Sequence, residues 1–389
     1  MRKSSIKGKL NLSTRTELEL LVIQPTAFCN LDCRYCYVPE RTNPARISNQ
    51  TLSKLCIALS NAGRIKNQSH IEVLWHAGEP LAAGLPFYQE ARAIFNEKLG
   101  TKPEVRQTFQ TNATLINRAW CEYFIESNSL VGISLDGPKE IHNSQRFSRS
   151  KRGSFDKVMQ GVALLRNHDI PINALCVLTP VSLQQPDRIF DFFSSNNILN
   201  IAFNVEETEG EHLVSALKDK STVRNDYLAF MLRFLELNLD HGCLLKIREF
   251  QAQSQYLWNR AHDRSFCPDE AENSVGRIIT VSCKGEVFSW SPELASGAHG
   301  NVAFFSLGNI NEVGSLDELI DCPKASRIQS EINSGIDKCK KTCKYFNVCG
   351  GGSPANKFYE NGSFDSTETL RCRLQTQALT DLILEQSGR

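Results

Sequence analysis

Apolar runs of strand length alternate along the chain with amphipathic stretches of helix length. Patterns of these two kinds predict β-strands and α-helices. The predicted strands span residues 18–24, 70–75, 104–110, 130–135, 171–178 and 199–204. The predicted helices lie near residues 49–63, 86–99, 116–127, 154–168, 186–196 and 222–240, with Ser48 and Ser154 at N-cap positions and Gly100 just past a helix end.

This alternation predicts an α/β fold on a parallel sheet, because crossover helices connect parallel strands. Six strand–helix units fit a partial (β/α)6 barrel and also an open, doubly wound sheet. In both architectures, ligands gather at the C-terminal ends of the strands. Beyond the last predicted helix the pattern breaks into segments rich in Gly and Cys. The predicted organisation is a basic arm at 1–17, a barrel at 18–240 and a Cys-rich domain with a C-terminal helix at 241–389.

Composition narrows the functional classes. The 389 residues carry 44 Lys+Arg against 43 Asp+Glu, a net charge of +1, so no global field for nucleic acid or a membrane surface follows. The first fifteen residues are basic with no acid, and no apolar signal-peptide region follows them. No apolar run approaches the roughly 20 residues of a membrane span. The expected partners exclude nucleic acid and membranes, and the expected location is cytoplasmic.

The fourteen cysteines are many for a cytosolic chain, where metal binding is a commoner use than disulfides. Cys56, Cys121, Cys176 and Cys243 stand alone and are expected to be small buried hydrophobes. The others form two groups.

The first group is the run Cys29-x3-Cys33-x2-Cys36, which follows the first predicted strand. Three thiolates so spaced can hold three corners of a [4Fe–4S] cluster and leave the fourth iron open to a small molecule. The alternatives are a zinc site that lacks one ligand, and a disulfide with a spare thiol.

Polar residues also follow the next three predicted strands. Glu79 lies in Ala77-Gly78-Glu79-Pro80, where it could accept from a ligand ammonium group, and Gln110-Thr111-Asn112 and Ser134-Leu135-Asp136-Gly137 end the following two strands. These could converge on one ligand, or they could be turns. His76 could face a substrate or be a structural histidine. After the sixth strand, the acidic run 206–211 could line the cavity mouth or be a solvated loop.

The second cysteine group is Cys339-x3-Cys343-x5-Cys349 with Cys372 downstream. Its spacing fits zinc or an iron–sulfur cluster, and spacing alone does not decide between them. If the first group holds a redox-active iron–sulfur cluster, the second is expected to hold one too, because a redox reaction needs an electron acceptor.

The opening run resembles the signature of radical S-adenosylmethionine (SAM) enzymes, whose open iron chelates SAM and whose reduced cluster cleaves it to a 5′-deoxyadenosyl radical. This resemblance implies a SAM-binding [4Fe–4S] cluster on Cys29, Cys33 and Cys36. Residues 77–80 look like the Gly-Gly-Glu-Pro motif that touches the SAM amino group. The remaining SAM contacts that it implies are Asn112, Ser134 and Arg146 for the ribose and carboxylate, and Tyr35 and Leu178 for the adenine.

The second group is similar to the SPASM extension of peptide-modifying radical SAM enzymes. The resemblance implies a distal auxiliary cluster on Cys339, Cys343, Cys349 and Cys372. For the proximal cluster the chain departs from the pattern, since Gly285-x4 arrives at Trp290 and Cys349-x3 at Ser353. Cys267, Cys283 and Cys322 remain as candidates for an incomplete or absent site.

The residues that follow Gly285-x4 discriminate between two subgroups of these enzymes. Anaerobic sulfatase-maturating enzymes put an Asp base directly after Gly-x4-Cys, where this chain has Trp290-Ser291. A closer resemblance is to the GrrM/OscB group of cyclophane-forming peptide maturases, over stretches that include 22–26, 75–81, 203–207, 291–294 and 349–357. It implies a three-residue crosslink, from an aromatic ring carbon to the β-carbon two residues downstream, in a ribosomally made glycine-rich-repeat precursor peptide.

That reaction removes two electrons, of which SAM takes one. The distal cluster is the candidate for the second electron, and Glu206, Glu207 or water for the proton. A reductant or small electron-donor protein is a further expected partner. The alternatives are thioether formation, sulfatase-type formylglycine maturation and, in another class, a zinc-stabilised peptide-binding module.

Overall fold

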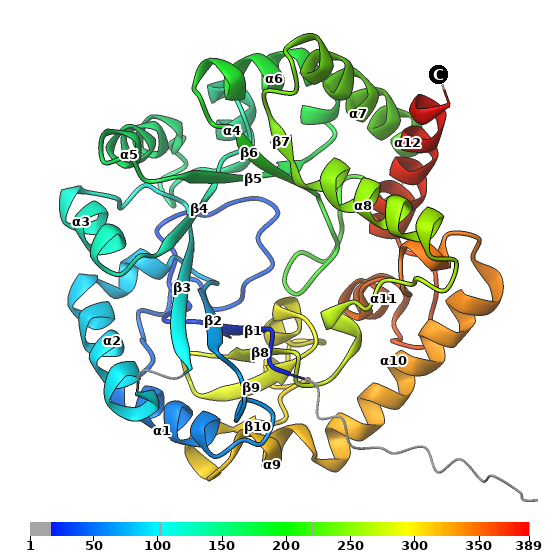
Figure 1. The fold of residues 1–389 in the computed structure, drawn as a ribbon. Helices are drawn as coiled ribbons and strands as arrows, with labels where there is room; N and C mark the ends of the chain where they lie inside the picture. The colour runs from blue at the N-terminus through cyan, green and yellow to red at the C-terminus, as the bar shows by residue number, and fades with distance from the viewer. Residues whose placement is uncertain (1–16, 101–102, 219–220, 389) are drawn as a thin grey trace, which may run out of the picture.

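The computed structural model describes residues 17–100, 103–218 and 221–388. Residues 1–16 of the predicted basic arm lie outside this range. One ten-stranded sheet runs through the described chain in the order β10-β9-β8-β1-β2-β3-β4-β5-β6-β7. It curves around a central space, and helices cover its outer side (Figure 1).

The central strands are parallel and follow each other in chain order from β1 to β7. Along β2 and β6 buried and partly exposed residues alternate, as expected for a strand with two different faces. The strands are β1 (Leu20–Ile23), β2 (His70–Trp75), β3 (Glu104–Thr111), β4 (Leu130–Ser134), β5 (Ile172–Leu178), β6 (Asn200–Val205) and β7 (Lys246–Ile247).

The connecting helices complete a partial (β/α) barrel, and the predicted fold class is confirmed. Ser48 caps the first helix by accepting from the backbone N–H of Thr51. Ser154 is the N-cap residue of its helix, as predicted, although its hydroxyl bonds His142 and the Arg146 carbonyl instead of the first-turn backbone. The helices are α1 (Asn49–Ser60), α2 (Leu85–Leu99), α3 (Arg118–Glu126), α4 (Lys139–Gln145), α5 (Phe155–Asn167), α6 (Pro186–Ser195) and α7 (Val223–Asp240).

The C-terminal third closes the open side of this barrel. Strand β8 (Ile278–Val281) pairs in parallel with β1, and β9 (Glu286–Ser289) and β10 (Gly308–Asn309) extend the sheet antiparallel. One sheet thus runs through residues on both sides of position 240, and the boundary predicted there stays a prediction. The helices of this part are α8 (Arg248–His262), α9 (Leu316–Ile320), α10 (Pro323–Thr342), α11 (Pro354–Asn361) and α12 (Leu379–Ser387), which is preceded by a π-helical segment, Cys372–Ala378.

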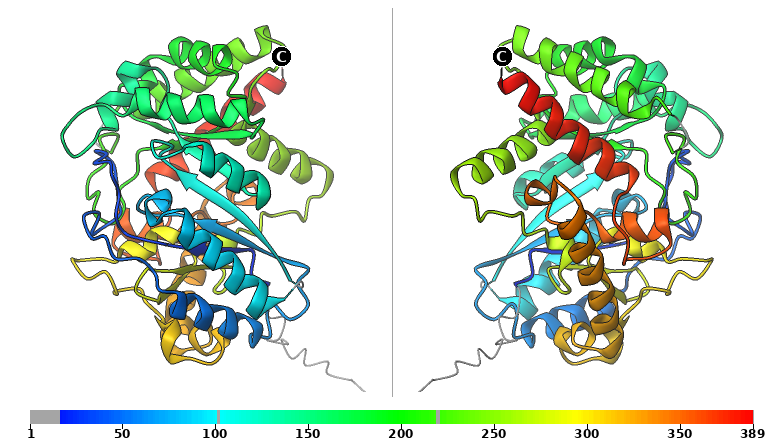
Figure 2. Two further views of the ribbon diagram at one scale, coloured as in Figure 1. Left: turned by 90° about the vertical axis from the view of Figure 1, so that its left-hand side faces the viewer. Right: turned by 90° about the vertical axis from the view of Figure 1, so that its right-hand side faces the viewer.

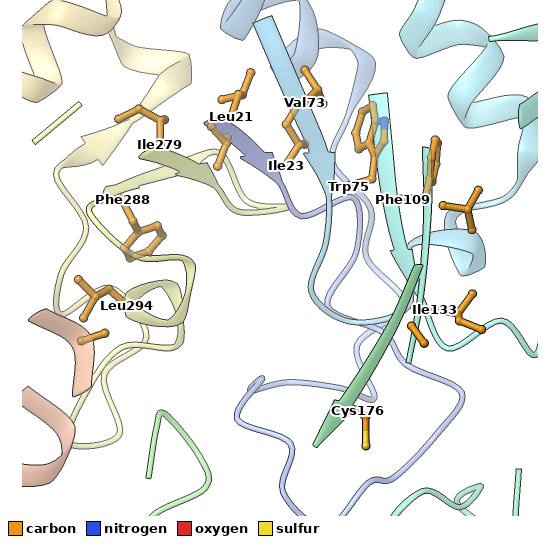
Figure 3. Packing of buried hydrophobic residues seen from close by; sticks show 14 of the residues in the cluster. Leu21, Ile23, Val73, Trp75, Phe109, Ile133, Cys176, Ile279, Phe288 and Leu294 are labelled. Atoms are coloured by element: carbon orange, nitrogen blue, oxygen red, sulfur yellow. The ribbon is translucent and has the colours of Figure 1, made fainter. Parts of the chain in front are cut away.

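Helix α12 packs against both α8 and α7, and it crosses the face of the molecule in red in the right-hand view of Figure 2. The main core lies between the sheet and its covering helices (Figure 3). At its centre Trp75 is fully buried, contacts Tyr88 of α2 edge to face at 5.0 Å and donates from Nε1 to Gln107 at 2.9 Å. Cys56, Cys121 and Cys176 are buried as predicted, whereas Cys243 is exposed because it lies in the turn after α7 with a positive φ of 59°.

Among the described residues, no helix combines the length and apolarity that crossing a membrane requires.

Candidate active site

Cys29, Cys33 and Cys36 lie on one loop that leaves the C-terminal end of β1. The segment after α4 holds this loop in place. The backbone N–H of Asp32 donates to the Phe147 carbonyl at 2.7 Å and that of Arg34 to the Gln145 carbonyl at 3.0 Å. Arg149 donates to the carbonyl of Cys29 at 3.0 Å. The loop is therefore anchored through its backbone, which leaves the thiols to bind something else.

The three thiols fit an iron–sulfur cluster by their chemistry. All are free of disulfides. Burial raises the pKa of Cys29 to about 12, and the nearby charges of Glu79, Cys33 and Cys36 raise it further. Burial likewise raises the pKa of Cys33 to about 11, with Cys36 and Asp136 adding to the shift and Arg146 opposing it. Because the thiolates repel one another in a buried place, they need a positive centre between them, which cluster iron provides.

The loop after β2 packs directly under the cysteine loop. Ala77 and Gly78 both have positive φ angles, 66° and 64°. A Cβ atom on Gly78 would lie 2.4 Å from the carbonyl oxygen of Thr26, so only glycine allows this approach. The Glu79 N–H donates to the Phe28 carbonyl at 2.7 Å, and Pro80 is buried at the start of a 3-10 turn.

The side chain of Glu79 joins two strand ends. One oxygen accepts from Thr111 Oγ1 at 2.6 Å and the Leu81 N–H at 3.0 Å, and the other accepts from the Asn112 N–H at 2.8 Å. Burial raises the pKa of Glu79 to about 7, and these three hydrogen bonds oppose the shift. A carboxylate offers about four acceptor positions, so roughly one remains for a ligand donor.

Asn112 links the end of β3 to the cysteine loop. Its Nδ2 lies 2.8 Å from Asn30 Oδ1 and 3.8 Å from Cys29 Sγ. Ser134, at the end of β4, accepts from Gln110 Nε2 at 3.2 Å, and Leu178 is fully buried at the end of β5. The structure thus places these three predicted SAM contacts at the C-terminal ends of three successive strands. Their contacts with SAM stay predictions.

Arg146 forms a buried ion pair with Asp136, at 3.0 Å from Nε to Oδ2. The same carboxylate accepts from the Tyr35 hydroxyl and from the Val177 N–H. The guanidinium also stacks over the Tyr35 ring, 5.1 Å from its centroid. Asp136 therefore holds Tyr35 and Arg146, both predicted SAM contacts, next to each other. We call Asp136, Arg146 and Tyr35 the paired cluster.

His76 bonds Tyr37, the residue after Cys36, at 3.0 Å from Nε2 to the hydroxyl. Among the described residues, its Nδ1 is buried without a hydrogen-bond partner, as is Thr280 Oγ1, and both residues line a cavity of about 10 Å³ that is large enough for one water. Burial lowers the pKa of His76 to about 4, so the ring is neutral at pH 7.

The glutamates of the acidic run after β6 have two different surroundings. Glu206 bonds within its own loop, whereas Glu207 and Glu209 lie near other carboxylates. Glu206 accepts from His212 and from the Ala216 N–H, both at 3.0 Å, and thereby shapes its own loop. Asn356 of α11 donates to Glu207 and, at 3.3 Å, to Glu209. Burial raises the pKa of Glu209 well above its usual value, and the charge of Glu207 raises it further. Which of Glu206 and Glu207 accepts a proton stays a prediction.

Glu293 joins this group from the turn after β9. It accepts from the Ser291 hydroxyl, and burial together with Glu272 and Glu207 raises its pKa to about 7. Arg371 is the nearby cation, 4.0 Å from Glu207 and from Glu272. The sequence reasoning missed Glu293 as a candidate acid or base. The available signal was its place two residues after Ser291, on the strand end where related enzymes carry their base. We call Glu207, Glu209, Glu293 and Arg371 the acidic cluster.

The second cysteine group is assembled from three elements. Cys339 lies in α10, Cys343 and Cys349 in the following loop, and Cys372 at the start of the π-helical segment. Burial raises the pKa of Cys372 to about 12, with the neighbouring charges of Cys349 and Cys343 adding to the shift. Burial also raises the pKa of Cys349, and its partners Gly351 N–H, Gly352 N–H and Thr376 oppose that.

A buried cation accompanies this group. Lys357 of α11 is 3% exposed, and burial lowers its pKa while Cys339, Cys349 and Cys372 oppose the change. Four thiols with N–H donors and a buried lysine suit a negatively charged cluster. A cavity of about 220 Å³ borders Cys349 and Cys372, and Glu270, Glu272, Arg371 and Ser353 also line it. No group of His, Cys, Asp or Glu within the described ranges is arranged to hold a single metal ion.

Comparison with known proteins identifies related chains. Residues 23–193 match the family model of the Radical SAM superfamily. An uncharacterized protein of Synechocystis sp. is 38% identical over 370 residues, 94% of this chain and 91% of that protein. The serine-type anaerobic sulfatase-maturating enzyme of Bacteroides thetaiotaomicron is 33% identical over 356 residues, 87% of this chain and 83% of that enzyme. The solved structure of native anSMEcpe with bound AdoMet and Cp18Cys peptide shares the fold, with a TM-score of 0.74, 22% identity and coverage of 94% and 97%.

Proposed function

The chain belongs to the radical SAM superfamily, with homology to anaerobic sulfatase-maturating enzymes over most of its length, and from this premise we propose that it oxidises a serine or cysteine side chain in a peptide. As a radical SAM protein it uses a [4Fe–4S] cluster and SAM. When bound, these supply a 5′-deoxyadenosyl radical that removes a hydrogen atom from carbon.

The observation that carries the proposal is the 33% identity over 356 residues with a sulfatase-maturating enzyme. That enzyme is a serine-type sulfatase-maturating enzyme, and the anSMEcpe structure contains a peptide. We assign the same class of substrate to this chain. All the enzyme alternatives that the sequence left open are also peptide-modifying radical SAM enzymes.

The residues of this chain would act in two groups, one that binds SAM and its cluster and one that accepts a proton from the peptide. In the first group, Cys29, Cys33 and Cys36 would hold the cluster, and the strand-end residues Glu79, Asn112 and Ser134 would orient SAM. In the second group, the acidic cluster would accept a proton from the peptide. Oxidation of a serine CH₂OH to an aldehyde removes two hydrogens. One leaves as the abstracted atom, and the other leaves as a proton and an electron.

Glu293 answers the objection that the sequence raised against this reaction. The aspartate base of sulfatase-maturating enzymes is replaced by Ser291, but Ser291 donates to Glu293 two residues further on. A base acts best when its pKa lies near the operating pH, and burial raises that of Glu293 to about 7. The remaining electron would pass to a distal cluster held by Cys339, Cys343, Cys349 and Cys372.

A second candidate is cyclophane formation in a glycine-rich-repeat precursor peptide. It is favoured by Trp290 and Ser291, which stand where sulfatase-maturating enzymes carry Cys and Asp. Trp290 is fully buried and donates to Gln329 at 3.0 Å, so it belongs to the core. The same proton acceptor and electron acceptor would serve this reaction, because forming a carbon–carbon bond also removes two hydrogens.

The test is anaerobic reaction of the reconstituted chain with SAM and reductant, using two peptides. One is a sulfatase-type peptide with a target Ser or Cys, and the other is a glycine-rich-repeat precursor peptide. Release of 5′-deoxyadenosine and an aldehyde that a hydrazide reagent traps at the target residue are expected. Loss of two hydrogen masses from an aromatic residue and its neighbour, without hydrazide trapping, would favour the cyclophane. Zinc in place of iron and no deoxyadenosine with either peptide would support the binding module instead.

A further inference from the structure

The three cysteines considered for a proximal auxiliary cluster lie on three separate elements. Cys267 is in the loop after α8, Cys283 is in the turn between β8 and β9, and Cys322 is the residue before α10. Thiolates that ligate one [4Fe–4S] cluster must converge on one compact body. We infer that these cysteines share no cluster and that the chain binds two [4Fe–4S] clusters. This inference rests on the SAM-dependent part of the proposed function and not on the identity of the peptide.

Cys283 and Cys322 lie beyond opposite ends of β8. The N–H of Cys283 donates to Gln24 Oε1 at 3.4 Å, just past the C-terminal ends of β1 and β8. Cys322 follows Ile320, which lies against Gly276 before the start of β8, where an added Cβ would be 3.0 Å from it. At about 3.3 Å per residue, β8 alone separates the two ends by roughly 10 Å.

Cys267 is separated from Cys322 by the length of α10. Its sulfur lies 3.8 Å from the Phe346 carbonyl, beyond the C-terminal end of that helix, and the charge of Lys340 acts on it. Cys322 occupies the N-cap of the same helix and accepts from the Ala325 N–H at 3.4 Å. An α-helix of 20 residues is about 30 Å long.

Cys267 and Cys283 also lie by opposite ends of β8. Asp269, two residues after Cys267, pairs with Arg277 at 2.7 Å, and Arg277 precedes β8. Cys283 follows β8 and instead lies by Gln24 and beside Lys284, which pairs with Glu40 at 2.9 Å. Figure 1 shows α10 running along the side of the molecule and β8 crossing its interior, so both separations can be followed there.

The two remaining positions of the SPASM pattern offer no replacement ligand. Trp290 is fully buried and hydrogen-bonded to Gln329. Ser353 lines the 220 Å³ cavity together with Cys349 and Cys372. The space beside Cys349 and Cys372 is therefore a cavity that Arg371 and Ser353 line, and position 353 brings no thiolate to it. One auxiliary centre then takes the single electron that peptide oxidation releases, and no relay through a second auxiliary centre is needed.

The experiment counts iron in the full chain after anaerobic reconstitution, without peptide. We expect about eight irons per chain, the sum of two [4Fe–4S] clusters. The variant Cys267→Ser/Cys283→Ser/Cys322→Ser should keep about eight irons, and serine retains an N-cap acceptor at position 322. The matched variant Cys339→Ser/Cys372→Ser should keep about four. About twelve irons, or a loss of about four in the first variant, would overturn the inference.

Electron paramagnetic resonance gives a second readout that does not depend on turnover. In Cys29→Ala/Cys33→Ala/Cys36→Ala, reduction with dithionite should produce a single cluster signal of about one spin per chain. Two interacting signals would show a second auxiliary cluster, and no signal would show that the distal cysteines hold none. Both results contradict the two-cluster assignment. Failure of the peptide reaction would leave it intact, since no peptide is present.

Discussion

The molecule contains a buried group and a partly buried group of charged residues, and the two differ in their balance of positive and negative charge. In the paired cluster one carboxylate meets one guanidinium, and Asp136 also accepts from Tyr35 and from Val177. In the acidic cluster three carboxylates share Arg371, which stays 4.0 Å from Glu207. The first has no unmatched charge, so it suits a structural role. The second is short of positive charge, and the pKa values of Glu209 and Glu293 are raised, first by burial and then by neighbouring carboxylates, which suits proton transfer.

The difference follows from where each group lies. The paired cluster joins Tyr35, from the loop after β1, to Asp136 and Arg146, from the segment between β4 and α5, and all three belong to the N-terminal barrel. The acidic cluster combines the loop after β6, the turn after β9 and the segment before the π-helix. Residues from distant parts of the chain meet there because the C-terminal third closes the barrel.

Replacing the candidate base should have the largest effect. Glu293→Gln keeps the size of the side chain and removes its capacity to accept a proton. Peptide oxidation should fall by about 10²–10⁴-fold, the usual contribution of general base catalysis. Wild-type turnover should rise with pH through about 7, the raised pKa of Glu293. The measurement is product formation by mass spectrometry as a function of pH.

The control for this variant is Glu312→Gln, an exposed glutamate in the same part of the chain. It should leave the rate and the pH profile unchanged. An unaltered pH profile in Glu293→Gln would assign the proton to another group. The assay should also measure 5′-deoxyadenosine, which is expected to persist without product in the variant.

Breaking the paired cluster should instead cost stability. Arg146→Met leaves the Asp136 carboxylate buried without its cation, which destabilises by about 3–5 kcal/mol. Arg233→Met is the matched control, because Arg233 pairs with Asp187 at 2.6 Å on the exposed surface, where solvent screening makes such pairs contribute little to stability. Urea unfolding under anaerobic conditions measures both. Equal losses in the two variants would show that Asp136 is not as isolated from solvent as the structure indicates.

The acidic cluster should make stability depend on pH. The folded-state pKa of Glu293 is about 7, above its unfolded value of about 4.5, so the fold favours the protonated form. The stability that this preference contributes is fully present below pH 4.5 and is lost as the pH rises through 7. Relative to Glu293→Gln, the wild-type free energy of unfolding should therefore drop by about 1–2 kcal/mol between pH 5 and 8. A constant difference across that range would contradict the raised pKa.

The smallest effect is expected from Ser291→Ala. The variant removes the hydroxyl that donates to Glu293 and opposes the rise of its pKa. The rising limb of the pH–rate profile should move upward by about one pH unit, because hydrogen bonds to a charged group are worth about 1.5–3 kcal/mol. Ser291→Thr keeps the donor and should restore the wild-type profile. A downward shift in Ser291→Ala would mean that the hydroxyl accepts from a protonated Glu293.

Much of the fold could be predicted from the sequence because its signals are local. The six predicted strands match β1–β6, and the six predicted helices match α1–α3 and α5–α7, because each of these segments carries its own periodic pattern of buried residues. The short helix α4 (Lys139–Gln145) was not predicted. Cys29, Cys33 and Cys36 were recognisable for the same reason, because they occupy one short loop. Ser154 is the N-cap residue that the sequence predicts, but no local pattern reveals that its hydroxyl bonds His142, a tertiary partner.

The sequence by itself determined the strand–helix order, the cysteine loop after β1 and the superfamily. Only the tertiary structure decided that β8 joins the barrel sheet beside β1, that Glu293 and Glu209 meet around Arg371, and that Cys283 and Cys322 lie at opposite ends of a strand. The physical reason is that local patterns specify each element through its own burial. Contacts between distant elements depend on how those elements pack, and the acidic cluster consists of such contacts.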